Sequence, residues 1–278
     1  MNSSRRAPRK PSSRANKTVG LARALSKLGY CSRSQAFELI RAGKVRLNGV
    51  RPRNPETPVR MGVDRIEVEG AVVQAAEKIY LMMNKPVGLV TTADDEKGRE
   101  TVYSLLPEGL VWIAPVGRLD KGSEGLLLFT NDSAWATKIT DPESHLDKTY
   151  HVQIDRVADD DLIRQLESGV RVAGEERLRA KSVRILRRGG KTCWLEIVLD
   201  EGKNRQIRRM LEASGVAILR LVRVAIGLLR LGTLAKAAHR ALTTSEKDAL
   251  DLALSASQER KLKQKLKIDG YRTKNKNS

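Results

Sequence analysis

The chain has few of the side chains that build disulfide, metal or nucleotide sites. Its 278 residues include two cysteines, Cys31 and Cys193, and three histidines, and none of these stands in a CxxC or HExxH pattern. A disulfide framework or a Cys/His zinc site is therefore not expected. The sequence also lacks GxxxxGKS/T and GxGxxG, the glycine-rich patterns that bind nucleotide phosphates. We expect neither a bound metal nor a nucleotide cofactor.

Long apolar runs are also absent. The longest, at 217–231, is interrupted by Arg220, Arg223 and Arg230, so no membrane-spanning segment is predicted. The basic N-terminus is not followed by the apolar stretch of a secretory signal. We therefore expect a cytoplasmic protein with no membrane partner. A monomer is expected too, because no stretch of the sequence indicates an oligomeric seam.

Acidic residues are scarce where the basic ones gather. The net charge is +19; residues 1–17 carry six basic side chains and no acid, and residues 260–278 carry eight basic side chains and one acid. Because both ends are also poor in apolar residues, we expect disordered basic tails at 1–17 and 257–278. Residues 71–259 are nearly neutral. A polyanion is the first partner to suspect for such a chain.

The N-terminal module reads as two helices and a hairpin. A first helix is predicted after Thr18, a candidate N-cap, with leucines on one face. A second helix is predicted to start after Ser32, because Ser32 and Gln35 have the spacing of a capping box. The alternating segment KVRLNG, 44–49, predicts a strand that ends in a hairpin turn.

This module carries charges of nearly one sign. Between residues 21 and 53 there are eight basic residues and a single acid, Glu38. A surface built only for solubility would intersperse acids, so contact with phosphates is favoured over a merely solvated surface. The candidate RNA-binding residues on this face are Arg23, Lys27, Arg33, Arg41, Lys44 and Arg46.

The stretch ALSKLGYCSRSQAFELIRAGKVRLNG resembles the S4 RNA-binding domain. The resemblance implies an RNA partner without saying which RNA, because S4 domains occur in ribosomal proteins, tRNA synthetases and RNA-modifying enzymes. We assign residues 18–70 to this small S4-like α/β domain and residues 71–78 to a linker.

The larger module, 79–256, is predicted to be α+β with a mixed, largely antiparallel sheet. Several apolar strand candidates follow one another without a crossover helix, which argues against a doubly wound parallel sheet. Helices are predicted at about 159–168, 204–214 and 245–255. The candidate strands are 79–83, 87–92, 111–116, 126–130, 149–154, 181–186, 192–199, 217–224 and 226–231.

Two segments of this module each contain a residue that has either a structural or a functional role. In PVGRLDKGSEGLLLFTND, 115–132, Asp120 lies among glycines just before an apolar run. An Asp in such a place is most often an ordinary turn residue. In DKTYHVQI, 147–154, Tyr150 stands in an alternating strand pattern. It is either half-buried sheet packing or an aromatic platform for an unpaired base.

A third segment, DEGKNRQIRRMLEASG at 200–215, predicts an amphipathic helix. Asn204 is its candidate N-cap, and Ile207, Met210 and Leu211 form its apolar face. A second face is basic, and it is either solvated or suited to contact with phosphate or carboxylate groups. It contains Arg205, Arg208 and Arg209.

Together, and behind an S4-like domain, these segments resemble one family: the S4-domain ribosomal RNA pseudouridine synthases of the RsuA type. The most specific single motif is GRLD with a small residue three positions after the Asp and a glycine five positions after it. The matching stretches are NKPVG at 84–88, GRLDKGSEGLLLFTND at 117–132, K-T-Y at 148–150, EGKNRQIRRM at 201–210 and RLVRVAIGLLRLG at 220–232.

The resemblance implies an enzyme that isomerises uridine to pseudouridine without cofactor or metal. Asp120 is then the catalytic nucleophile, Arg208 the cation that favours its ionised form, and Tyr150 a platform for a base that has left its stack. Arg118 matches an arginine that helps hold the RNA open, and Leu119 packs behind Asp120. The candidate RNA-binding residues in this module are Arg118, Arg205 and Arg209.

Two other functions remain open from the sequence. A ribosome-assembly or rRNA-binding factor without activity would suit the basic tails but would not need Asp120, Tyr150 and Arg208. A metal-assisted phosphotransferase would need further carboxylates, and no DxD pattern accompanies GRLD. The expected partner is 16S or 23S ribosomal RNA or a partly assembled subunit. The EGKNRQIRRM form favours the large subunit without fixing the subunit or the uridine.

Overall fold

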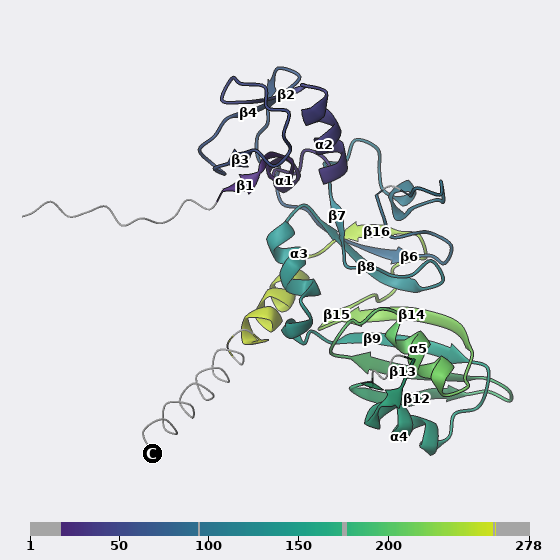
Figure 1. Cartoon of the computed structure of the whole chain (residues 1–278). Coiled ribbons are helices and arrows are strands. Elements are labelled where there is room, and N and C mark those ends of the chain that lie inside the picture. The colour runs from purple at the N-terminus through teal and green to yellow at the C-terminus, as the bar shows by residue number, and fades with distance from the viewer. Residues whose placement is uncertain (1–17, 94, 174–176, 258, 260–278) are drawn as a thin grey trace, which may run out of the picture. The chain divides into compact units, whose positions relative to one another are not determined.

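The computed structural model describes residues 18–93, 95–173, 177–257 and 259. The tail predicted at 1–17 lies outside the described residues, as does the tail predicted at 257–278 apart from residues 257 and 259. Residue 257 lies in a helix, so the chain is still ordered where the C-terminal tail was predicted to begin. The chain divides into two compact units, with the boundary between Ala76 and Glu77 (Figure 1).

The N-terminal unit contains two short helices and two small sheets. β1 pairs with β3, and β2, β4 and β5 form a second antiparallel sheet. Its core consists of the buried faces of both helices, packed with Val45, Val59, Ile66 and Val68. The elements are β1 (Val19–Gly20), α1 (Leu21–Lys27), α2 (Arg33–Arg41), β2 (Val45–Leu47), β3 (Pro58–Val59), β4 (Ile66–Val68) and β5 (Ala71–Val72).

Several details of this unit match the sequence pattern. The Ser32 hydroxyl accepts from the Gln35 N–H at 3.1 Å, and the Gln35 side chain accepts from the Ser32 N–H at 3.0 Å, which confirms the capping box. Asn48 and Gly49 both have positive φ, 50° and 83°, as a type I′ turn requires. The turn is followed by only one isolated β-bridge, between Leu47 and Val50, and not by a hairpin strand. The strand that pairs with β2 is instead β4.

Two predictions for this unit are wrong. Thr18 does not cap the first helix: the N-cap is Gly20, without a side-chain hydrogen bond, because the preceding residues pair with β3. Residues 71–78 are not entirely a linker, since β5 pairs with β4. The β4–β5 turn forms because Glu69 and Gly70 adopt positive φ values of 51° and 89°.

The larger unit is built on one mixed sheet. Within the described residues it has nine strands in the order β12-β13-β9-β14-β8-β6-β16, with β15 on β14 and β7 on β8. β8 and β14 run parallel, and every other described pair is antiparallel, which confirms the predicted α+β class with a mixed, largely antiparallel sheet. The strands are β6 (Tyr80–Lys85), β7 (Ala114–Val116), β8 (Glu124–Thr130), β9 (Lys148–Ile154), β12 (Ser182–Arg188), β13 (Cys193–Leu199), β14 (Ile218–Ile226), β15 (Leu229–Arg230) and β16 (His239–Ala241).

Helices cover parts of this sheet. Leu162 and Leu166 of α4 and Ile207 and Met210 of α5 share one core with β9 and β13, so both helices lie on the same face there (Figure 1). Residues 244–257 are helical as well, and α3 packs with them in a second core. The remaining elements are α3 (Ser133–Thr140), α4 (Asp160–Ser168), α5 (Gln206–Ala213), the short η1 (Val102–Leu105) and η2 (Pro142–Ser144), and a ribbon of β10 (Val170–Arg171) and β11 (Arg177–Leu178).

The predicted strand at 87–92 does not form. β6 ends at Lys85, and the following segment has only an isolated bridge between Val90 and Thr101. Leu89 and Thr91 are nevertheless buried. The apolar pattern therefore reflects a turn that packs into the core rather than a strand of the ladder.

Candidate active site

Asp120 lies in the loop that joins β7 to β8. Gly117 turns the chain with a φ of +73°, and the Ser123 N–H donates to the Asp120 carbonyl at 2.9 Å, closing a tight turn. Leu119 is buried against Met83 and Phe129 in the core beneath the loop. The carboxylate itself is only partly exposed, with 34% of its side-chain surface accessible. The turn therefore presents one acid at the edge of the sheet.

A buried lysine fixes this turn from below. The Lys85 ammonium, at the end of β6, has no exposed surface. It donates to the carbonyls of Pro86 at 3.0 Å, Asp120 at 3.2 Å and Ser123 at 2.9 Å. Burial lowers the pKa of this amine to about 8, and the charges of Asp120 and Glu124 oppose the shift. A buried cation with three carbonyl partners is a rigid support for the loop.

A threonine completes the support. The Thr91 hydroxyl donates to the Leu119 carbonyl at 2.7 Å and accepts from the Leu119 N–H at 3.4 Å. Sequence reasoning assigned no role to either Thr91 or Lys85. The NKPVG segment at 84–88 was the available signal, because a lysine directly after an apolar strand is unusual unless it is paired.

β8 anchors the loop from its other end. All seven residues of β8 are buried, Leu126 and Leu128 in one core and Leu127 and Phe129 in another. A strand buried on both faces reads as a continuous apolar run rather than an alternating one. Near its start, Gly125 lies against the backbone of Arg223 in β14, where a Cβ atom would be 2.9 Å from the Arg223 nitrogen and closer still to its carbonyl oxygen. Only glycine fits there, which explains one glycine of the GRLDKGSEG segment.

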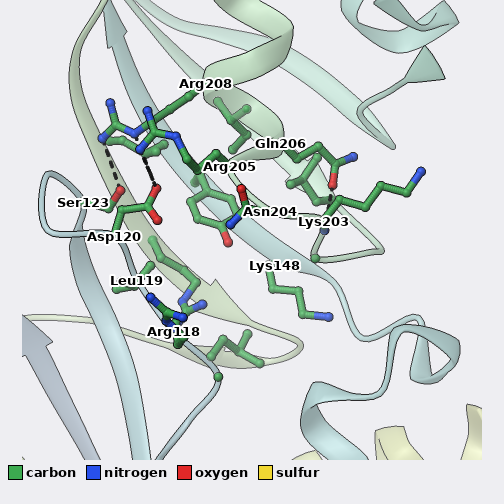
Figure 2. Close-up of a pocket in the computed structure, with 18 of the residues that line it drawn as sticks. Arg118, Leu119, Asp120, Ser123, Lys148, Lys203, Asn204, Arg205, Gln206 and Arg208 are labelled. Carbon is green, nitrogen blue, oxygen red and sulfur yellow. Dashed lines mark hydrogen bonds and ion pairs between the residues drawn. The ribbon is translucent and has the colours of Figure 1, made fainter. Parts of the chain in front are cut away.

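Two arginines from the start of α5 point to the Asp120 carboxylate. The distances to its Oδ2 are 3.5 Å from Arg205 Nη1 and 3.7 Å from Arg208 Nε. Arg208 Nη2 also donates to the Gly122 carbonyl at 2.7 Å. It lies 3.2 Å from the Ser123 hydroxyl, to which it donates as well (Figure 2). The buried Arg208 Nε has no hydrogen bond, so the carboxylate is the group it faces. Arg208 thus joins α5 to the Asp120 turn.

The helix that carries these arginines starts one residue later than predicted. Asn204 is not its N-cap; the N-cap is Arg205, in the left-handed region with a φ of 48° and without a side-chain cap. The Gln206 side chain instead accepts from the Lys203 N–H at 3.3 Å, closing the first turn. A non-glycine residue with positive φ stores strain. Arg205, the residue with this left-handed backbone, is also the one whose guanidinium lies near the Asp120 carboxylate.

These residues surround one cavity of about 420 Å³. Asp120, Tyr150 and Arg208 all line it, as do Arg118 and Arg205 (Figure 2). Arg209, on the same helix, is half-buried and does not line the cavity. Of the predicted residues in this unit, the fold therefore brings every one but Arg209 to a single place. The apolar part of the wall includes Val116, Leu119, Ile139, Leu199, Leu221 and Ile226.

Tyr150 lines the cavity from the central part of the sheet. It stands in β9, directly opposite Ile197 of β13 and Arg223 of β14. The ring is half-buried and packs against two hydrophobic cores, one on either side of the sheet's centre. A ring held in this way is rigid, and part of it stays accessible to a ligand.

The predicted RNA-binding residues of the N-terminal unit are mostly at its surface. Lys27 is half-buried, and the other five are exposed. The fold also brings acids near two of them: the Lys44 ammonium pairs with Glu69 at 2.8 Å, and Arg46 stands opposite Glu67 in the β2–β4 ladder. The basic surface is therefore less uniform than the sequence of residues 21–53 indicates.

The described part of the chain also lacks two other kinds of feature. Within the described residues, no three His, Cys, Asp or Glu side chains are grouped closely enough to hold a metal ion. None of the helices in that part of the chain has the length and apolar character needed to cross a membrane.

Comparison with known proteins places both units in families. Residues 79–213 match the family described as RNA pseudouridylate synthase, and residues 19–64 match the S4 domain. The chain is 36% identical over 227 residues to ribosomal large subunit pseudouridine synthase B of Bacillus subtilis (strain 168), which covers 81% of this chain and 93% of that protein. It is 34% identical over 223 residues to an uncharacterized RNA pseudouridine synthase of Aquifex aeolicus (strain VF5), covering 80% and 89%.

A solved structure is similar over nearly its full length. The crystal structure of a pseudouridylate synthase matches with a TM-score of 0.59 at 29% identity, covering 84% of this chain and 99% of that one. The sequence resemblance to S4-domain pseudouridine synthases is thereby confirmed. The chain belongs to the RNA pseudouridylate synthase family, carries an S4 domain before the catalytic domain, and is an isomerase that forms pseudouridine in RNA.

Proposed function

We propose that this enzyme isomerises a specific uridine of ribosomal RNA to pseudouridine, with Asp120 as the catalytic nucleophile and without a cofactor. The observation that carries the proposal is the position of the Asp120 carboxylate. It lies at the wall of a cavity, 3.5 and 3.7 Å from two arginine nitrogens, on a turn held by Lys85 and Thr91. A nucleophilic carboxylate must be held in place, and the supported turn and the two neighbouring arginines support this role for Asp120.

The reaction breaks one bond to the ribose and forms another. The N1–C1′ bond of uridine is cleaved, the uracil rotates, and its C5 joins C1′. The proton on C5 is released and N1 takes up a proton, so the product is an isomer of uridine. Asp120 can act by attack on C1′, by attack on C6 of the base, or by assisting elimination at the ribose. Each route needs an ionised carboxylate, so the two arginines serve all three.

The cavity offers a place for the base after it leaves its stack. Uridine inside a folded RNA must be extruded before its C1′ is accessible. The rigid, partly exposed ring of Tyr150 provides a surface for the uracil. Arg118, whose side chain is exposed at the rim, is positioned to contact the strand that the base leaves. These roles agree with the RNA-binding residues predicted for this unit.

Ribosomal RNA as the substrate rests on the relatives and on the S4 domain. The Bacillus subtilis relative carries a ribosomal large subunit name, so we propose 23S rRNA, free or in a partly assembled subunit, ahead of 16S rRNA. The five exposed basic residues of the S4 domain would bind the phosphates around the target. A monomeric enzyme in the cytoplasm, where the ribosome is assembled, fits this substrate.

The test compares wild-type enzyme with Asp120→Asn on rRNA that carries tritium at C5 of uridine. Wild type should release tritium, and the variant should release none while it binds the RNA with unchanged affinity. Asn has nearly the shape of Asp, so a lost activity with retained binding isolates the charge. If wild-type enzyme released no tritium from rRNA or from partly assembled subunits, the chain would be an rRNA-binding factor rather than a modifying enzyme of that substrate. Mapping pseudouridine in cells with and without the protein then identifies the position.

A further inference from the structure

Arg223 is a buried guanidinium with an unused donor. It stands in β14 and lines the cavity, yet only 6% of its surface is exposed. Its Nε donates to the Leu126 carbonyl at 2.7 Å, whereas its Nη2 is buried and has no hydrogen-bond partner. A buried donor left unpaired destabilises the fold, and more so when it is charged. Such a group in the wall of a binding cavity indicates a partner that arrives with the ligand.

Lys148 adds a second cation to the same wall. It stands two residues before Tyr150 in β9, so the two side chains lie on one face of the strand, and Arg223 lies opposite Tyr150. Burial lowers the pKa of Lys148, and the positive charge of Arg223 lowers it further, although Asp147 and Asp200 oppose the shift. The Lys148 ammonium makes no hydrogen bond or ion pair with any residue that the structure describes. The nearby Asp147 is bound by Lys181 at 2.7 Å.

The cavity as a whole carries an excess of positive charge. Of the described residues that line it, six are cationic and one, Asp120, is acidic. Arg205 and Arg208 are directed to that acid. Arg223 and Lys148 form no ion pair with a described residue, although like charges brought together in a partly buried place repel one another. An uncharged uracil could satisfy a hydrogen bond of Arg223 but could not neutralise the pair.

We propose that Arg223 and Lys148 form an anion subsite that binds a phosphate group of the RNA strand next to the target uridine. This proposal rests on the proposed function, because it assumes that the target uridine enters this cavity. A phosphate accepts charge-assisted hydrogen bonds from a planar guanidinium. It is also attracted by an ammonium group, which acts as a compact point charge. Figure 2 shows Lys148 on the side of the cavity away from Arg208, so this cation is separate from the arginine that joins α5 to the Asp120 turn. Binding there would position the ribose relative to the Asp120 carboxylate.

The experiment measures binding of small probes to the full chain without turnover. Dissociation constants are determined for uridine, uridine 3′-monophosphate and uridine 5′-monophosphate by NMR titration of wild type, Lys148→Gln and Arg223→Gln. Lys191→Gln is the matched control, since this exposed lysine lies outside the cavity and loses the same charge. Lys148→Gln is the main variant because Arg223 also bonds β8 and its replacement can disturb folding.

We expect one of the two monophosphates to bind wild type about tenfold more tightly than uridine, a difference of about 1.4 kcal/mol. Lys148→Gln should remove most of this ratio, and Lys191→Gln should leave it unchanged. A ratio near one in wild type would overturn the proposal. So would a Lys148→Gln enzyme that keeps the ratio, including the case in which uridine and both monophosphates weaken equally because the contact is to the base. Because no turnover is measured, an enzyme inactive on ribosomal RNA would count against the proposed function alone.

Discussion

Replacing Gly125 by alanine should destabilise the catalytic domain because two backbones approach each other too closely for a side chain. Gly125 has a φ of +100° and lies in β8 against Arg223 of β14. An added Cβ would be 2.9 Å from the Arg223 nitrogen and 3.0 Å from its carbonyl carbon, and closer to the carbonyl oxygen. These neighbours are backbone atoms inside a sheet, so they cannot rotate away as a flexible side chain would.

The size of the effect follows from two costs. Positive φ disfavours a residue with a Cβ by roughly 1–2 kcal/mol, and overpacking a well-ordered core costs about 1–3 kcal/mol. The expected loss is therefore about 2–5 kcal/mol in the free energy of unfolding, or roughly 5–20 °C in Tm for a domain of this size. The loss should also reduce activity, because the residues that follow Asp120 lead directly into this part of β8.

Urea unfolding followed by tryptophan fluorescence measures this effect in the full chain. All three tryptophans, Trp112, Trp135 and Trp194, belong to the catalytic unit, so the signal does not report the S4 domain. Gly190→Ala is the control, because a Cβ at that position meets no atom within 4 Å and its φ is not positive. It should change the free energy of unfolding by no more than about 1 kcal/mol. A Gly125→Ala variant as stable as this control would refute the steric reasoning.

Three further predictions concern other parts of the chain. Arg208→Lys keeps the charge but loses the guanidinium contacts with the Asp120 turn, so tritium release should fall at least about tenfold while RNA binding by filter assay is unchanged. Full activity of this variant would contradict the proposed role of Arg208 in holding the turn. The Arg240 guanidinium holds the pKa of Glu246 down to about 2, so this carboxylate stabilises the fold above its unfolded pKa and the stability is lost as the pH falls toward 2. Glu246→Gln should therefore cost about 1–2 kcal/mol in urea unfolding at pH 7, less at pH 4 and least at pH 3, and a constant difference would argue against the ion pair. Ser32→Ala removes the capping box of α2, costs about 1 kcal/mol and should speed amide hydrogen exchange in 33–41; unchanged exchange would show that the cap is dispensable.

Local signals in the sequence were reliable where the physics is local. The capping box at Ser32, the turn at Asn48-Gly49 and the apolar face of α5 depend on residues within one or two turns of each other, and all three form. The signals failed where a distant segment competes. Thr18 lost its capping role because Val19 and Gly20 pair with β3. In the segment 87–92 Leu89 is buried but Val87 is exposed, and the segment makes only an isolated bridge through Val90.

Sequence patterns alone indicate the α+β class, the family resemblance and the candidates Asp120, Tyr150 and Arg208. They do so because these features depend on residue types at short, fixed spacings. Three relations depend on the three-dimensional fold: Lys85 supports the Asp120 turn, Gly125 allows the close approach of β14, and Arg223 and Lys148 share one wall of the cavity. Those relations join segments far apart in the chain, and their energies come from burial and from close approach, which no local pattern specifies.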